Sequence, residues 1–133
     1  MPKREVKHPD RTTPPGPYSL GVVCDGWLFI GGQTPLDHRT GQIVGQTIEE
    51  QTRATLANLD KILQAAGCTK NDVVKCACHL ADMGDFPAFS KTYGEYFNSG
   101  VLPVRMTVQS GMDKILVEID AIARVPKKVG HAG

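Results

Sequence analysis

Short segments in which apolar and polar residues alternate predict the β-strands of this chain. Residues 22–30 are interrupted by Asp25-Gly26, a pair that supplies the positive φ angles of a tight hairpin turn. Residues 73–80 form the next apolar segment, and 104–108 and 115–125 form two more near the end of the chain. We therefore expect five strands, the first two of them joined as a hairpin.

Two segments carry apolar residues at the spacing of a helix. The first begins at Thr47, whose spacing from Glu50 allows a capping box, in which each residue satisfies a free backbone donor of the other. Gly67 stands where a C-terminal cap belongs, and the second helix is expected over about 86–97. The two apolar stripes are Leu56, Leu59, Ile62, Leu63 and Ala66, and then Phe86, Phe89, Tyr93 and Phe97.

The order β-β-α-β-α-β-β predicts an α+β domain with a mostly antiparallel sheet and two helices on one face. A chain of 133 residues is the usual size of one domain, so we expect residues 1–133 to form a single unit. The Pro-rich beginning predicts an extended leader, assigned to residues 1–13, and residues 126–133 are expected to be a tail. The second face of the sheet needs a cover, which predicts an oligomer.

Composition narrows the functional classes. Apolar residues make up 41% of the chain, and 15 basic against 14 acidic residues give a net charge of +1, without the basic excess of a nucleic-acid binder. No apolar run is long enough to span a membrane and no signal-peptide pattern opens the chain, so a cytoplasmic location is expected.

The cysteines and histidines predict no metal site. Cys76 and Cys78 form a C-x-C within a predicted strand, and no second ligand pair follows them. The four cysteines are therefore interpreted as small core residues. The histidines are scattered at His8, His38, His79 and His131, without the spacing of metal ligands.

The last two predicted strands hold the candidate chemistry. If Ser110–Asp113 is a four-residue hairpin loop, Arg105 pairs directly with Glu118 on one sheet face. The planar fork of arginine matches a carboxylate, and a glutamate can hold a water molecule or move its proton. The alternative is an ordinary cross-strand salt bridge, and the pattern alone leaves both interpretations open.

Several short segments, in this order, resemble the RidA/YjgF family over about residues 14–125. They are Gly16-Pro17-Tyr18-Ser19, Gly32-Gln33-Thr34-Pro35-Leu36-Asp37, Thr40-Gly41-Gln42-Ile43-Val44-Gly45, Glu49-Glu50-Gln51-Thr52-Arg53, Leu56-Ala57-Asn58-Leu59, Ala65-Ala66-Gly67, Val73-Val74-Lys75, Asp82-Met83-Gly84-Asp85-Phe86, Tyr93, Tyr96-Phe97, Pro103-Val104-Arg105 and Val117-Glu118-Ile119-Asp120-Ala121-Ile122-Ala123.

The resemblance implies a chorismate-mutase-like α+β fold and a homotrimer with active sites in the clefts between subunits. It implies hydrolysis of reactive 2-enamine or 2-imino acids to 2-keto acids and ammonia, with no metal or organic cofactor. Carried over by position, Arg105 is the family's carboxylate-binding arginine, and Glu118 aligns with the glutamate that holds the attacking water. The positions expected to line the pocket are Tyr18, Gly32, Gln33, Tyr93 and Thr107.

Four departures from the family pattern affect the expected substrate. Many relatives have Ser-Cys where this chain has Met106-Thr107, serine where it has Gly31, and asparagine where it has Ser90. The stretch from Arg105 to Glu118 is also about two residues shorter than in many relatives. Two alternative functions stay open: some relatives are described as endoribonucleases or translation inhibitors, and a trimer of this kind could bind a small ligand without turning it over.

Overall fold

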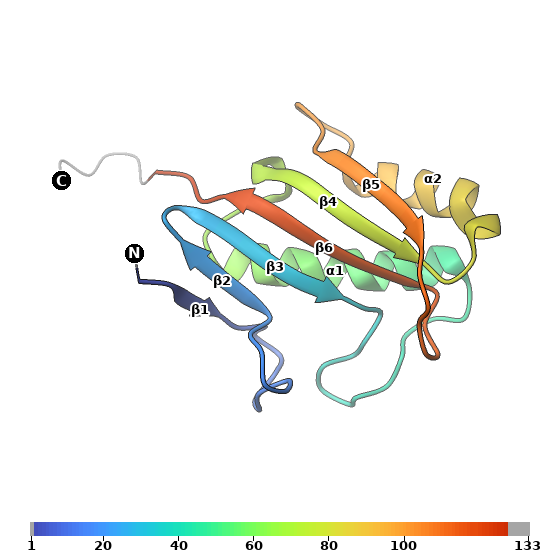
Figure 1. Cartoon of the computed structure of the whole chain (residues 1–133), viewed down its shortest axis with the longest axis horizontal. Helices are drawn as coiled ribbons and strands as arrows, with labels where there is room; N and C mark the ends of the chain where they lie inside the picture. Colours follow the sequence, from blue (N-terminus) through green and yellow to red (C-terminus); the bar gives the residue numbers. More distant parts are fainter. Residues whose placement is uncertain (1, 128–133) are drawn as a thin grey trace.

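The computed structural model describes residues 2–127, which form one six-stranded sheet and two α-helices (Figure 1). The strands are β1 (Arg4–Val6), β2 (Gly21–Cys24), β3 (Trp27–Gln33), β4 (Val73–Leu80), β5 (Val104–Gln109) and β6 (Val117–Arg124). The helices are α1 (Ile48–Ala65) and α2 (Phe86–Tyr96), and single 3-10 turns precede β4 (η1, Lys70–Asp72) and α2 (η2, Met83–Asp85).

The strand order across the sheet is β1-β2-β3-β6-β4-β5. Every neighbouring pair is antiparallel except β4 and β5, which run parallel. Both helices lie on one face of the sheet and pack against each other (Figure 1). The predicted fold class, an α+β chain with a mostly antiparallel sheet and two helices on one face, is confirmed.

The turn and cap signals of the sequence are confirmed at the predicted positions. Asp25 and Gly26 have φ angles of 55° and 80° and join β2 to β3. The side chains of Thr47 and Glu50 form the reciprocal capping box at the start of α1. Gly67, with φ of 78°, follows the end of that helix.

The predicted pairing of the last two strands is wrong. β6 lies between β3 and β4, and β5 pairs with β4 alone. Arg105 is therefore opposite Cys76, whereas Glu118 is opposite His79. Residues 110–116 form a crossover connection that passes the end of β4 and joins β5 to β6, in place of the predicted four-residue hairpin loop.

Burial and backbone conformation explain this arrangement. The inward residues of β6 are 0–2% exposed, a degree of burial that suits a central strand, and they are Val117, Ile119, Ala121 and Ala123. Lys114 has φ of 65°, which interrupts an extended conformation, and the Leu116 amide donates to the side chain of Gln51. The last strand therefore begins at Val117 instead of Ile115.

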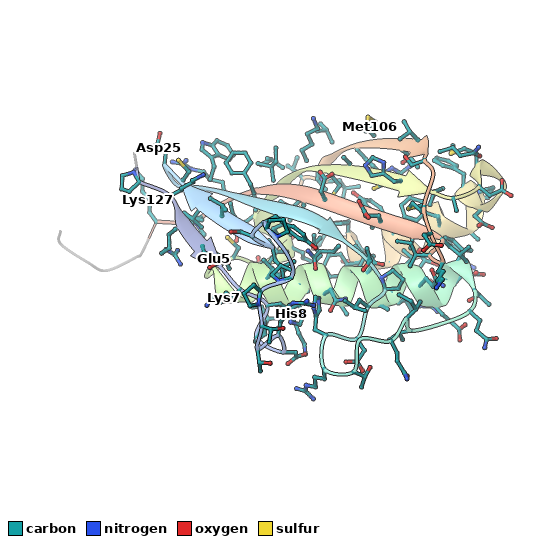
Figure 2. The ribbon with its side chains drawn as sticks, turned by 60° about the horizontal axis from the view of Figure 1, so that its bottom comes forward. Glu5, Lys7, His8, Asp25, Met106 and Lys127 are labelled. Atoms are coloured by element: carbon teal, nitrogen blue, oxygen red, sulfur yellow. The ribbon has the colours of Figure 1, made fainter. Side chains whose placement is uncertain are left out.

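The expected leader contains a strand that the sequence did not predict. Arg4–Val6 pairs antiparallel with β2 and forms one edge of the sheet. Figure 2 shows His8 just beyond this strand, next to α1. His8 is 1% exposed, so this part of the leader is packed into the domain. Most of the predicted tail lies outside the described residues.

The sheet face opposite the helices, called the open face below, carries exposed apolar side chains. They come from β3 and β5, with Phe29 at 47%, Val104 at 66% and Met106 at 45% exposure. Figure 2 shows Met106 projecting on the side of the sheet away from α1. Such a patch is typical of a surface that another protein chain covers. No helix among residues 2–127 is long and apolar enough to cross a membrane.

Candidate active site

Arg105 lies on the edge strand β5 with its side chain on the α2 side of the sheet. Its guanidinium carbon lies 4.9 Å from the ring centroid of Tyr93, 5.4 Å from that of Phe86 and 5.8 Å from that of Phe89. Its Nη1 donates a hydrogen bond to Ser90 Oγ at 3.2 Å. Three rings and one hydroxyl therefore fix the orientation of an exposed cation.

Arg105 has no acidic partner among residues 2–127, because the ion pairs there involve other residues. The cross-strand salt bridge with Glu118, which was the alternative interpretation, is therefore absent within one chain. A guanidinium has five N–H donors, and here only one of them is used by Ser90. The remaining donors are free for an anionic ligand.

The layer beneath Arg105 contains two thiols and two hydroxyls. Burial raises the pKa of Cys76 to about 11 and that of Cys78 to about 12. The hydroxyl oxygens of Tyr93 and Thr107 are buried without a well-formed hydrogen bond, Tyr93 beside Cys76 and Thr107 beside Cys78. Burial also raises the pKa of Tyr93, with the Cys76 thiol as the second cause. All four groups are therefore neutral at physiological pH.

Glu118 lies on the open face, opposite the side that carries Arg105. Along β6, Glu118 stands between the buried residues Val117 and Ile119, so its side chain lies on the face away from the core. A Cβ atom added to Gly32 would lie 2.7 Å from the Glu118 Cδ and 3.0 Å from its Cγ, so the carboxylate lies directly over that glycine. Glu118 forms no ion pair within the described chain.

A bulge in β3 makes room for this carboxylate. Ile30 is opposite Ala121 and Gln33 is opposite Ile119, so Gly31 and Gly32 together face only one residue of β6. Gln33 is 2% exposed and its amide donates to the Gly31 carbonyl at 3.0 Å. In this chain Gln33 therefore stabilises the bulge from the core side and does not project onto the open face.

Tyr18 lies in the segment that runs beside the same bulge. The amide of Gly31 donates to the carbonyl of Leu20 at 2.8 Å, which fixes the segment two residues after Tyr18. The Tyr18 side chain is 62% exposed and its ring lies against Gly16. Its phenol is free to contact a ligand or a second chain.

The structure thus divides the predicted site residues into two groups. The arginine group, on the α2 side of the sheet edge, consists of Arg105, Ser90, Tyr93 and Thr107. The glutamate group, at the β3 bulge on the open face, consists of Glu118, Gly32 and the nearby Tyr18 segment. One chain does not bring the two groups together, because they lie on opposite faces and are separated by β4.

Sequence reasoning missed the surroundings of Arg105. Ser90 was noted only as a departure from the family pattern, and Phe86 and Phe89 only as part of a core-facing stripe. The signal was present in the aromatic spacing of α2, but the parallel placement of β5 beside β4 was needed to put Arg105 over that stripe. No cluster of three or more potential metal-binding side chains occurs within residues 2–127.

Comparisons with known proteins agree with this fold. A family model described as endoribonuclease L-PSP matches residues 9–125. A RutC family protein of Pyrococcus horikoshii is 46% identical over 112 residues, which is 83% of this chain and 88% of that protein. A mouse protein named 2-iminobutanoate/2-iminopropanoate deaminase is 44% identical over 110 residues, covering 81% of each chain.

Solved structures give the same result. The Rid family protein YyfA of Yersinia pestis, described as a protein of unknown function, superposes with a TM-score of 0.88 at 34% identity, covering 93% of this chain and 100% of that one. E. coli TdcF with bound serine gives a TM-score of 0.82 at 30% identity, covering 91% and 98%. The molecule is thus a small α+β protein of the Rid type. The chain belongs to the RidA/YjgF family.

Proposed function

We propose that this protein hydrolyses small reactive 2-enamine and 2-imino acids to 2-keto acids and ammonia, with Arg105 binding the substrate carboxylate. The observation that carries the proposal is the state of Arg105: an exposed guanidinium, oriented by three aromatic rings and lacking an acidic partner within residues 2–127. Relatives named 2-iminobutanoate/2-iminopropanoate deaminase, at 44% identity in mouse and 38% in human, support the reaction class.

The chemistry of Arg105 suits a carboxylate better than a neutral group. A charged, planar fork binds the two oxygens of a carboxylate through parallel hydrogen bonds, each stronger than a neutral hydrogen bond. The rings of Phe86, Phe89 and Tyr93 restrict how the fork can rotate, so less entropy is lost when a ligand binds. TdcF was solved with serine bound, and serine carries a carboxylate of this kind.

Glu118 supplies the second requirement, which is a base that can activate water. Its carboxylate lies over Gly32, where no side chain covers it, and Glu118 is half-buried, so it keeps access to solvent. A carboxylate that is close to a bound water can orient it and accept its proton. Neither step needs a metal ion or an organic cofactor.

The proposal includes a site formed between subunits of a homotrimer. The arginine and glutamate groups lie on opposite faces of one sheet, so a complete site needs the arginine group of one chain beside the glutamate group of another. The exposed apolar residues of the open face favour such an assembly, since a monomer would leave them in water. The trimer, a cytoplasmic location and a protective role against reactive imines belong to the same proposal.

The reaction follows from these roles. A proton from solvent adds to the β carbon of an enamine and gives the iminium ion, which is the protonated imine and has an electrophilic carbon. Arg105 fixes the carboxylate, and water held by Glu118 adds to the imine carbon while Glu118 accepts a proton from that water. Glu118 returns the proton to the nitrogen of the carbinolamine, the C–N bond breaks and ammonia leaves, and the hydroxyl proton passes to Glu118 and then to solvent as the C=O bond of the 2-keto acid forms. Water is the only co-reactant, and atoms and charge balance.

The test is an assay in which a 2-imino acid is generated by an amino-acid oxidase and its loss is followed with and without the protein. Arg105→Lys retains the charge but loses the fork, so we expect KM to rise more than kcat falls. Glu118→Gln retains the shape but loses the base, so we expect kcat to fall by about 10²-fold or more. No acceleration by the assembled wild-type oligomer, with small or bulky imines, would refute the proposal.

Endoribonuclease activity is the second candidate, because the matching family model carries that description. The net charge of +1 gives this candidate little electrostatic support. RNA binding that weakens steeply with added salt, together with RNA cleavage lost in a Glu118→Gln protein, would favour it over imine hydrolysis. Binding of a carboxylate ligand without any turnover would instead indicate a regulatory trimer.

A further inference from the structure

The leader is attached to the domain through a buried histidine that the proposed reaction does not use. His8 is 1% exposed, and its Nε2 lies 3.0 Å from Asn58 Oδ1 on α1. Its other ring nitrogen, Nδ1, accepts a hydrogen bond from the backbone amide of Asp10 at 3.1 Å. Figure 2 shows His8 where the leader passes beside α1.

The hydrogen bonds around Asn58 determine which nitrogen of His8 carries the proton. Asn58 Nδ2 donates to the carbonyls of Thr34 at 2.9 Å and Leu36 at 2.7 Å, so its Oδ1 is the acceptor. His8 Nε2 must therefore donate to it, and Nδ1 must be unprotonated in order to accept from Asp10. His8 is thus held as the neutral Nε2–H tautomer, with both nitrogens satisfied.

His38 lies against His8 and is held in the same tautomer. The two ring centroids are 4.1 Å apart, and Arg11 Nη1 lies 3.2 Å from His38 Nδ1. Because arginine can only donate, His38 Nδ1 must be an unprotonated acceptor. A proton added to Nδ1 of His38 would face Arg11, and one added to Nδ1 of His8 would face the Asp10 amide. Each protonation would therefore replace a hydrogen bond by a contact between two donors.

The charged groups around the two rings add to this effect. A positive charge on His8 is disfavoured by Arg11 and Lys61 and favoured by Asp10. A positive charge on His38 is disfavoured by Arg11 and His8 and favoured by Asp10 and Asp37. Burial is the largest cause in both cases: it lowers the pKa of His8 and lowers that of His38 to about 4. Asp10 is itself engaged by Lys61 at 2.7 Å and by Arg39 at 3.0 Å.

The leader leads directly to the glutamate group of the candidate site. Residues 14–20 follow the His8–Arg11 turn, and the Leu20 carbonyl accepts the Gly31 amide at the β3 bulge. A cavity of about 120 Å³ lies within this segment and is lined by Glu5, Lys7, His8, residues 11–15 and Leu20. Besides the contacts of the two histidines, the ion pairs of Asp10 with Arg39 and Lys61 also hold residues 8–13 on the domain.

We propose that the His8–His38 pair is an acid-sensitive latch, which holds residues 8–20 on the domain while both rings are neutral and releases them when the rings take up protons. The release is a property of the fold and does not depend on the proposed reaction. Its consequence for turnover, through Tyr18 and the bulge beneath Glu118, rests on the proposed function. A protein that releases the leader but deaminates no imine would refute the proposed function and leave the latch standing.

Hydrogen–deuterium exchange of the full-length protein tests the latch. After correction for the intrinsic effect of pH, amide protection in residues 8–13 should fall about tenfold or more between about pH 7.5 and about pH 5. Peptides from α1 should keep their protection over that range. The Asp10 carboxyl stays ionised there, because its hydrogen bond with Lys61 lowers its pKa from an already acidic 3.8, so its ion pairs do not account for a release.

Two substitutions identify the groups responsible. His38→Phe retains a ring against His8, and His8→Gln retains a donor for Asn58, but neither can take up a proton in this range. The double variant should keep residues 8–13 protected at about pH 5, whereas His79→Gln, on the open face, should release them as the wild type does. Unchanged wild-type protection, or equal loss in the double variant, would overturn the proposal.

If the double variant proves loosely packed at neutral pH, the nitrogen chemical shifts of the wild-type histidine rings decide the question instead. Both rings should be neutral Nε2–H tautomers at about pH 7.5 and should titrate below the ordinary histidine range. An Nδ1–H tautomer or a charged ring at either His8 or His38 under these conditions would overturn the latch.

Discussion

Gly32→Ala places one methyl group against the Glu118 carboxylate and leaves the rest of the site intact. The added carbon would lie 2.7 Å from Glu118 Cδ, and ordinary contact begins at 3.4 Å, so the carboxyl group must move by about 0.7 Å or more. The group that moves is the end of a flexible side chain, and Gly32 is not among the glycines with positive φ. The free energy of unfolding should therefore change by less than about 1 kcal/mol.

The effect on catalysis should be much larger. A displacement near 1 Å of a positioned catalytic group costs up to about 10²-fold in rate, so kcat/KM for a 2-imino acid should fall about 10- to 100-fold. Gly31→Ala is the matched control, since its added carbon would meet only the Leu20 and Ser19 carbonyls, at 3.5 and 3.7 Å. That variant should retain activity within about twofold.

The assay is the loss of enzymatically generated imine, measured beside urea unfolding of both variants. Equal activity of the Gly31→Ala and Gly32→Ala proteins, at equal stability, would refute the reasoning that the position of the Glu118 carboxylate over Gly32 matters for catalysis. Loss of stability in Gly32→Ala alone would show instead that the bulge cannot accept a side chain.

Three further predictions concern the fold. Thr47→Ala removes one half of the capping box and should lower the free energy of unfolding by about 1 kcal/mol without changing imine hydrolysis. Asn58→Leu leaves the His8 ring and two backbone carbonyls without their partner and should cost about 2–4 kcal/mol by urea unfolding. Cys76 and Cys78, whose thiols are buried and have raised pKa values, should react with Ellman's reagent near pH 8 only after unfolding in urea.

Each of these three predictions has its own control or its own result that would contradict it. Gln64→Leu, on the exposed side of α1, is the control for Asn58→Leu and should change stability by less than about 0.5 kcal/mol. A Thr47→Ala protein as stable as the wild type would contradict the capping argument. Rapid labelling of Cys76 or Cys78 in the native protein would show that β4 opens locally or that its inner face is accessible.

The parts of the fold that the sequence predicted are those determined by neighbouring residues. Asp25-Gly26 fixes a hairpin through its own backbone angles, and Thr47 with Glu50 fixes a helix start within one turn. Alternation along β6 correctly placed Glu118 on the face opposite the core. In each case the physical cause lies within a few residues of its effect.

The order of the strands was beyond this kind of reasoning. Alternation tells which face a residue occupies but not which strand lies beside it, so the short loop after β5 was interpreted as a hairpin. The near-complete burial of Val117 and Ala123 places β6 in the centre of the sheet, and only the packed structure reveals that burial. The aromatic surroundings of Arg105 and the contact of His8 with His38 depend on the same long-range placement.

The central claim is that a working site combines Arg105 of one chain with Glu118 of another. Arg105→Ala and Glu118→Gln should each be inactive in imine hydrolysis, and their co-expressed, co-purified mixture should recover about a quarter of the wild-type rate, because random pairing gives that share of interfaces with both groups intact. Recovery at that level would support a site between subunits. The claim would be contradicted if the wild-type oligomers are active and the mixture is inactive, although both variants are shown to occur in one oligomer.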